Sequence, residues 1–100
     1  MSRPFYSEYV RHCLRFYSRN LQCTTFKTKV DELNWSACHT SVSPLSNKMK
    51  DIIVMVYGGH DTLADEVYNA ARKYSINQNI IWDAMKDIER SVAKHRGLVS

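Results

Sequence analysis

Residues 67–86, VYNAARKYSINQNIIWDAMK, decide the fold of this chain. Apolar and small side chains recur at spacings of three and four on both sides of a break at Ser75, which predicts two helices joined by a short turn. Ala71 is small where the two helices approach each other most closely. Ile81 and Met85 fall on the face of the second helix that packs back onto the first.

The ends of these two helices follow from the residues around them. Asp61 is the expected N-cap of the first helix, which spans about 62–73. Asn77 is the expected N-cap of the second, which continues to about residue 95 and is closed by Gly97.

Three further helices are predicted upstream, over about 4–19, 28–42 and 47–57. The helix over 47–57 is so apolar that most of its circumference must be covered, so we expect it at the centre of the core. No second alternating run exists for it to pair with as a strand. The sequence therefore predicts an all-α fold, a compact bundle of about five helices in a single domain over 1–100.

The same spacing predicts which side chains face inward. In the second helix these are Val30, Leu33 and Ala37, and Trp35 is expected in the core. The apolar face of the first helix comprises Phe5, Tyr6, Tyr9, Val10, Cys13, Leu14, Phe16 and Tyr17. That of the last helix comprises Ile80, Ile81, Ala84, Met85, Ile88 and Val92.

Composition excludes several classes of protein. Of the 100 residues, 44% are hydrophobic, yet no apolar run is long enough to span a membrane and the N-terminus lacks the apolar block of a signal peptide. We therefore expect a cytoplasmic protein. The three cysteines are widely spaced, which indicates reduced thiols, and Cys13 is expected in the core.

The sequence contains no signature of catalysis or cofactor binding. No Cys and His pair has the spacing of zinc ligands, and neither a glycine-rich phosphate loop nor a nucleophile elbow occurs. We expect no enzyme activity, no cofactor and no metal.

Residues 67–86 resemble the helix-turn-helix of bacterial DNA-binding proteins, and the longer stretch 45–98 is similar to a sigma-factor region 4 module. The Arg96-Gly97-Leu98 ending is similar to that of small phage and mobile-element regulators. Ser75 stands where such motifs prefer glycine, because the backbone at that position often needs a positive φ. The resemblance implies a small transcriptional regulator that reads the major groove of duplex DNA.

The resemblance also implies which residues touch DNA. The expected base contacts are at the solvent-facing start of the second helix: Asn77, Gln78, Asn79, Trp82 and Lys86. Asn and Gln amides both donate and accept in the geometry that adenine offers. The expected phosphate contacts are basic residues from three helices: Arg72, Lys73, Arg90, Lys94, Arg96, Arg11, Arg15 and Arg19.

Charge placement leaves a second interpretation open. The net charge of +4 divides into +5 over residues 1–30, −4 over 31–66, +2 over 67–76 and +1 over 77–100, so most of the excess lies outside the predicted recognition helix. The alternative is a non-catalytic helical adaptor that docks a protein partner, such as RNA polymerase or a phage component, through the aromatic face of the first helix. The sequence also leaves open a homodimer on paired half-sites.

Overall fold

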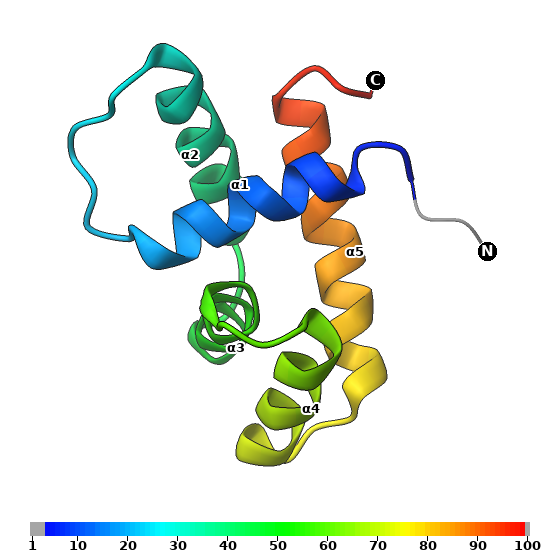
Figure 1. The fold of residues 1–100 in the computed structure, drawn as a ribbon. Helices are drawn as coiled ribbons and strands as arrows, with labels where there is room; N and C mark the ends of the chain where they lie inside the picture. The colour runs from blue at the N-terminus through cyan, green and yellow to red at the C-terminus, as the bar shows by residue number, and fades with distance from the viewer. Residues whose placement is uncertain (1–3, 100) are drawn as a thin grey trace.

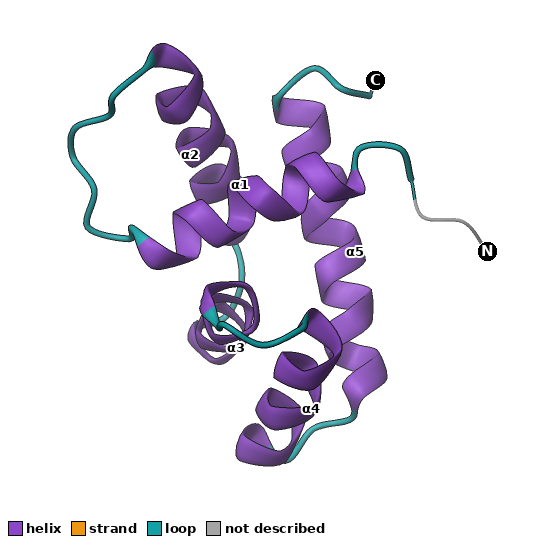
Figure 2. Ribbon diagram, in the orientation of Figure 1, coloured by secondary structure: helices purple, strands orange, loops and turns teal. Residues whose placement is uncertain are grey.

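The computed structural model describes residues 4–99, which form five helices and no strand (Figures 1 and 2). The helices are α1 (Ser7–Arg19), α2 (Lys29–Val42), α3 (Asn47–Gly58), α4 (Leu63–Tyr74) and α5 (Gln78–His95). The predicted all-α fold with five helices is confirmed.

The helices pack around α1 and α3. Helix α1 runs across α2 and α5 and also packs on α3, while α3 packs on α4 (Figure 1). Helix α4 and the turn that leads from it into α5 lie at the end of the molecule opposite the end of α5 (Figure 1).

Helix α3 supplies the centre of the core, as its composition predicts. Ile52, Ile53 and Tyr57 are fully buried and Val56 is almost so. They pack among buried side chains of the other helices: Val10, Cys13, Leu14, Tyr17, Ala37, Cys38, Val42, Leu63, Val67, Ala70, Ala71, Ile81, Met85, Ile88, Val92 and Ala93.

Four helices begin with a side-chain cap. The oxygens of Thr28, Ser46, Thr62 and Asn77 each accept a hydrogen bond from a backbone N–H in the first turn. The prediction that Asp61 caps α4 is wrong by one residue. Its backbone N–H donates to Glu66 instead, at 3.2 Å.

Helix α1 begins three residues later than predicted. Residues 4–6 form a turn in which the Ser7 N–H donates to the Pro4 carbonyl at 3.1 Å. Pro4 therefore initiates a turn before the helix rather than occupying its first position.

The predicted inward face of α2 is right for Ala37, which is buried, but wrong for Val30 and Leu33. Val30 is 52% exposed and Leu33 is 41% exposed, whereas Asn34 is buried. The Asn34 side-chain oxygen accepts from the Tyr9 hydroxyl at 3.1 Å and from Arg96 Nε at 2.6 Å. The hydrogen-bonded side chain of Asn34 thus occupies the inner face of α2, and Val30 and Leu33 face solvent.

Other aromatic and apolar side chains are also less buried than predicted. Phe5 is 79% exposed, Ile80 is 53% exposed and Tyr9 is 41% exposed. Trp35 is only half-buried, because it packs beside the connector after α1 and donates its indole N–H to the Asn20 carbonyl at 3.0 Å. These residues lie at the edge of the core. The spacing of apolar residues predicts which face of a helix turns inward, but not how deeply each side chain is buried.

Candidate functional site

A three-residue turn, residues 75–77, joins α4 to α5. Ser75 has φ 55° and ψ 48°, the left-handed conformation, and is the one non-glycine residue with positive φ among residues 4–99. The Ile76 N–H donates to the Ala71 carbonyl at 3.0 Å, and the Ser75 N–H donates to the same carbonyl. These two hydrogen bonds to one carbonyl end α4 sharply. Ser75, where the resemblance led us to expect a positive φ, does adopt one.

The start of α5 is capped by Asn77. Its side-chain oxygen accepts from the Asn79 N–H at 2.7 Å. The amide NH₂ of Asn77 stays available to an outside acceptor, but its oxygen is committed to the helix. Of the residues predicted to contact bases, Gln78 and Asn79 therefore keep both halves of their exposed amides free of cap bonds.

Further along α5, the solvent face carries charges of both signs. Asn79, Asp83, Lys86, Arg90 and Lys94 recur at three- and four-residue spacing, and all are exposed. The structure places these predicted contacts on one face, but Asp83 lies between Asn79 and Lys86. A carboxylate repels phosphate, so the part of α5 best suited to DNA is its first turn together with the basic residues from Lys86 onward.

Trp82 lies apart from the first-turn amides. It is half-buried and lines a recess of about 270 Å³ between the start of α1 and the middle of α5. Arg11 and Lys86 line the same recess. Its remaining lining residues are Pro4, Tyr6, Ser7, Asp83, Met85 and Glu89. Arg11, a predicted phosphate contact, therefore lies in the same recess as Trp82 and Lys86, two predicted base contacts.

A second recess, of about 370 Å³, lies at the α4–α5 turn. Arg72 and Gln78 line it together with Tyr68, Ala71, Ile76 and Asn77. The Arg72 guanidinium lies 5.7 Å from the centroid of the Tyr68 ring and donates to the Tyr68 hydroxyl at 3.4 Å. Tyr68, which is 48% exposed, was not among the predicted contacts. In the sequence, Tyr68 stands four residues before Arg72, a spacing that brings two side chains together on one face of a helix. Their contact could have been predicted from this spacing.

Lys73 also lies at the end of α4. It is exposed, and its Nζ is 5.5 Å from the centroid of the Tyr74 ring. Two cations held over aromatic rings therefore lie next to the turn that presents Gln78 and Asn79.

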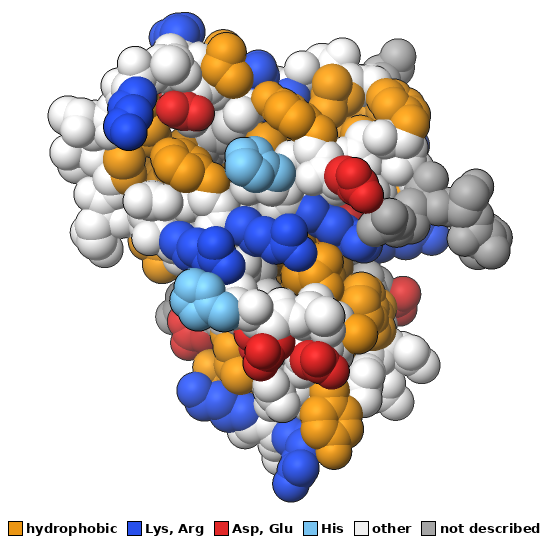
Figure 3. Space-filling model, in the orientation of Figure 1, with side chains coloured by type: hydrophobic (Ala, Val, Ile, Leu, Met, Phe, Trp, Pro, Cys, Tyr) orange, Lys and Arg blue, Asp and Glu red, His pale blue; other side chains and the backbone are white. Residues whose placement is uncertain are grey.

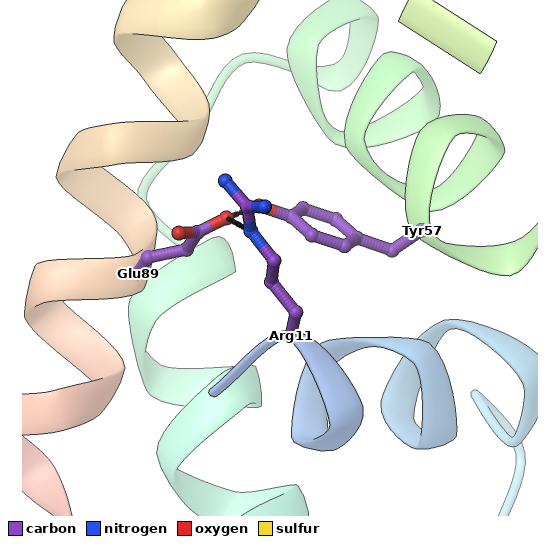
Figure 4. Close-up of polar contacts among 3 residues, drawn as sticks. All are labelled: Arg11, Tyr57 and Glu89. Carbon is purple, nitrogen blue, oxygen red and sulfur yellow. Dashed lines mark hydrogen bonds and ion pairs between the residues drawn. The ribbon is translucent and has the colours of Figure 1, made fainter. Parts of the chain in front are cut away.

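Arg11 of the predicted phosphate stripe is engaged inside the protein. Its Nε donates to Glu89 Oε2 at 3.0 Å, and the Tyr57 hydroxyl donates to the same oxygen (Figure 4). Burial raises the pKa of Tyr57 and the Glu89 charge raises it further, so the phenol stays protonated and donates. The cluster joins α1, α3 and α5.

Arg19, at the other end of the stripe, binds the end of α3. Its guanidinium donates to the Gly58 carbonyl at 3.2 Å and to the Gly59 carbonyl at 2.8 Å. Arg15 lies between the two and lines a shallow recess with Glu8, Arg11 and Leu63, and no hydrogen bond or ion pair joins it to another residue within 4–99. Figure 3 shows Lys and Arg side chains in a row along α1. Of Arg11, Arg15 and Arg19, Arg15 alone has no hydrogen bond or ion pair within residues 4–99.

Arg96 is likewise held within the fold. It is half-buried, and its Nε bonds Asn34 at 2.6 Å. Arg90 and Lys94, by contrast, are exposed. Of the eight predicted phosphate contacts, Arg11, Arg19 and Arg96 are therefore bonded to other parts of the fold, and Arg72 is bonded to Tyr68 within α4. The other four have no hydrogen bond or ion pair within residues 4–99: Arg15, Lys73, Arg90 and Lys94.

The cysteines have no role at this site. Cys13 and Cys38 are buried and all three cysteines are free thiols. Within the described part of the chain, no three His, Cys, Asp or Glu side chains cluster in a way that would hold a metal ion. No helix there is long and apolar enough to cross a bilayer.

Comparison with known proteins yields no relative. No family model, no curated protein and no solved structure matches the chain. Its function must therefore be argued from its own residues.

Proposed function

We propose that this protein binds duplex DNA through the α4–α5 turn, as a small helix-turn-helix regulator of the kind that sigma-factor region 4 represents. The observation that carries the proposal is the 75–77 turn. Because α4 ends sharply at Ser75, the first turn of α5 exposes Gln78 and Asn79 to solvent, with Gln78 beside Arg72 and with Lys73 two residues before the turn. Amides flanked by cations combine the chemistry of base readout with that of phosphate attraction.

In this proposal each contact has a defined role. Gln78 and Asn79, with the amide NH₂ of Asn77, face base edges in the major groove. Arg72 and Lys73 meet the phosphates on one side of the groove, and Lys86, Arg90 and Lys94 meet those along α5. Trp82 borders the recess beside α1, where it packs rather than reads a base.

Fluorescence anisotropy with a random-sequence duplex over a salt series tests the proposal. We expect measurable affinity at low salt that falls linearly with the logarithm of salt concentration. The Arg72→Ala/Lys73→Ala variant should weaken binding and reduce the salt slope by about 2, because each lost phosphate contact removes about 0.9. A Lys27→Ala/Lys29→Ala variant removes the same charge around the start of α2 and serves as the control. Absence of binding at low salt, or equal weakening by both variants, would contradict the proposal.

A second candidate function is supported by the exposed aromatic residues at the start of α1. Phe5 is 79% exposed and stacks edge-on against Tyr6, with ring centroids 5.6 Å apart. Tyr9 is 41% exposed. Aromatic side chains at a surface are typical anchors of protein interfaces, so this end of α1 suits an adaptor that docks a protein such as RNA polymerase.

The adaptor function has its own test. In a binding measurement with purified RNA polymerase, Phe5→Ser should weaken the complex at least tenfold, which is the loss of one interface anchor. Tyr68→Ser, which alters an exposed aromatic on α4, is the control. Equal affinities of the wild type and Phe5→Ser would eliminate docking through this face.

A further inference from the structure

A third recess, of about 420 Å³, lies along one face of α3 and reaches the last two residues of α4. It is also bounded by the end of α1 with the connector after it, and by the end of α2. The lining residues are Tyr17, Leu21, Val42, Lys50, Asp51, Val54, Met55, Lys73 and Tyr74.

The interior of this recess is apolar. Val42 and Tyr17 are buried at its base, and Val54 and Met55 are half-buried along its side. The Tyr17 hydroxyl is already bonded to His39 Nδ1 at 3.2 Å, so Tyr17 brings no free polar group to the recess. A volume of 420 Å³ falls within the range of about 300 to 1,000 Å³ that is typical of small-molecule sites.

The charges around the recess are unequal. Lys50 and Lys73 contribute two ammonium groups and Asp51 one carboxylate. No ion pair joins either lysine to a carboxylate within residues 4–99. Lys73 lies over the Tyr74 ring, at 5.5 Å, which keeps its ammonium beside the apolar surface. An apolar interior with two unpaired cations at its edge complements a molecule that has an alkyl body and an anionic head.

We propose that this recess binds a small amphipathic carboxylate, such as a medium-chain fatty acid. The alkyl chain lies against Val42, Val54 and Met55, and the carboxylate lies between Lys50 and Lys73. Asp51 disfavours the anion and limits its affinity. The recess shares Lys73 with the proposed DNA-binding surface, but Lys50, Asp51 and the apolar lining do not belong to that surface. Octanoate binding can therefore fail while DNA binding holds, and the reverse.

Titration of the protein with octanoate, followed by amide chemical shifts in NMR, tests the site. Saturable shifts are expected at residues 17–21, 50–55 and 73–74. The neutral analogue octanol should bind at least fivefold more weakly, because it lacks the charge that the lysines attract. Octanol that binds as tightly as octanoate, or shifts scattered over the whole chain, would overturn the proposal.

Charge variants sharpen the test without altering the core. Lys50→Gln/Lys73→Gln should weaken octanoate binding about fivefold to tenfold, since each exposed pair contributes a few-fold. Asp51→Asn should strengthen it about threefold, by the same estimate. Lys27→Gln/Lys48→Gln removes two exposed lysines outside the recess and should leave affinity within twofold. An equal loss in both lysine doubles, or no gain in Asp51→Asn, would refute the assigned role of these charges.

Discussion

Tyr57 donates its hydroxyl hydrogen to Glu89 Oε2 at 2.5 Å, across 32 positions of sequence, in the interior of the protein. The same oxygen accepts from Arg11. A single carboxylate oxygen therefore joins three helices that are distant along the chain, and its charge is balanced inside the fold.

Glu89→Ala should destabilise the protein by about 2–4 kcal/mol, because it leaves the half-buried Arg11 without its counter-charge and the buried Tyr57 without its acceptor. Tyr57→Phe keeps the ion pair and should cost about 1–2 kcal/mol. Urea unfolding followed by circular dichroism measures both. The assignment fails if Glu89→Ala costs no more than Tyr57→Phe. The Arg11→Met/Glu89→Met double variant, which removes both charges together, should be more stable than Glu89→Ala.

Ser75→Gly should stabilise the protein by about 0.5–1 kcal/mol. Ser75 has a positive φ of 55°, which costs about 1–2 kcal/mol for an L-residue and which glycine adopts freely. Ser36→Gly provides the opposite control, because the same substitution at an exposed position within α2 should cost about 0.5–1 kcal/mol. Thermal unfolding distinguishes the two variants by the sign of the shift in Tm.

Substitutions of Arg15 and Arg19 should differ in their effects on DNA affinity and on stability. Arg15→Ala should leave the free energy of unfolding within about 0.5 kcal/mol, since no described residue is bonded to it. Arg19→Ala should cost about 1 kcal/mol, because it removes two hydrogen bonds to the Gly58 and Gly59 carbonyls. If α1 contributes to DNA binding, anisotropy titrations should show the larger loss of affinity in Arg15→Ala. Unchanged affinity in both variants would place the DNA-binding surface away from α1.

Stability should fall in alkaline solution. Burial raises the pKa of Tyr57 from an ordinary value of 10.0 and that of Cys38 from 9.0. The unfolded chain therefore releases these protons at a lower pH than the folded one, so the stabilisation is complete below about pH 9 and is lost as the pH rises above it. Each group should lower the free energy of unfolding by about 1.4 kcal/mol per pH unit beyond its ordinary pKa. Urea unfolding at pH 7, 9 and 10.5 measures the trend, and a flat profile would contradict it.

The three thiols should differ in reactivity in the folded protein. Burial raises the pKa of Cys13 and of Cys38, whereas Cys23 is half-buried in the connector after α1. A thiol-specific reagent should modify Cys23 first and reach the other two only on unfolding. Mass spectrometry of the modified protein identifies the order, and Cys23→Ser should abolish the fast phase.

The helices were predictable because their signals are local. Ser46 and Asn77 are caps next to apolar runs, and Gly97, with φ 73°, closes α5 as expected. The inner face of α2 was not predictable in this way. The hydrogen bonds that hold Asn34 inside come from Tyr9 and Arg96, which lie 25 and 62 residues away.

The candidate site was predictable to a similar degree. The exposure of Gln78 and Asn79 follows from the polar residues of the turn themselves. The positive φ of Ser75 was expected from the resemblance to helix-turn-helix motifs, because serine by itself disfavours it. The internal partner of Arg11 does not, because Glu89 lies 78 residues further along. A sign was present in the sequence: Glu89 stands four residues after Met85 and three before Val92, within the apolar register of α5, where a charge requires a partner.

The hydrogen bonds to Glu89 Oε2 determine whether a shorter fragment of the chain can keep its structure. Residues 45–98, the part that resembles a known module, include Tyr57 and Glu89 but not Arg11. An excised fragment would enclose an anion whose neutralising cation had been cut away, and it would uncover the surface of α3 against which α1 packs. The DNA-reading unit proposed here is therefore not portable: grafting it onto another protein, or shortening the chain to it, requires α1 to be carried along.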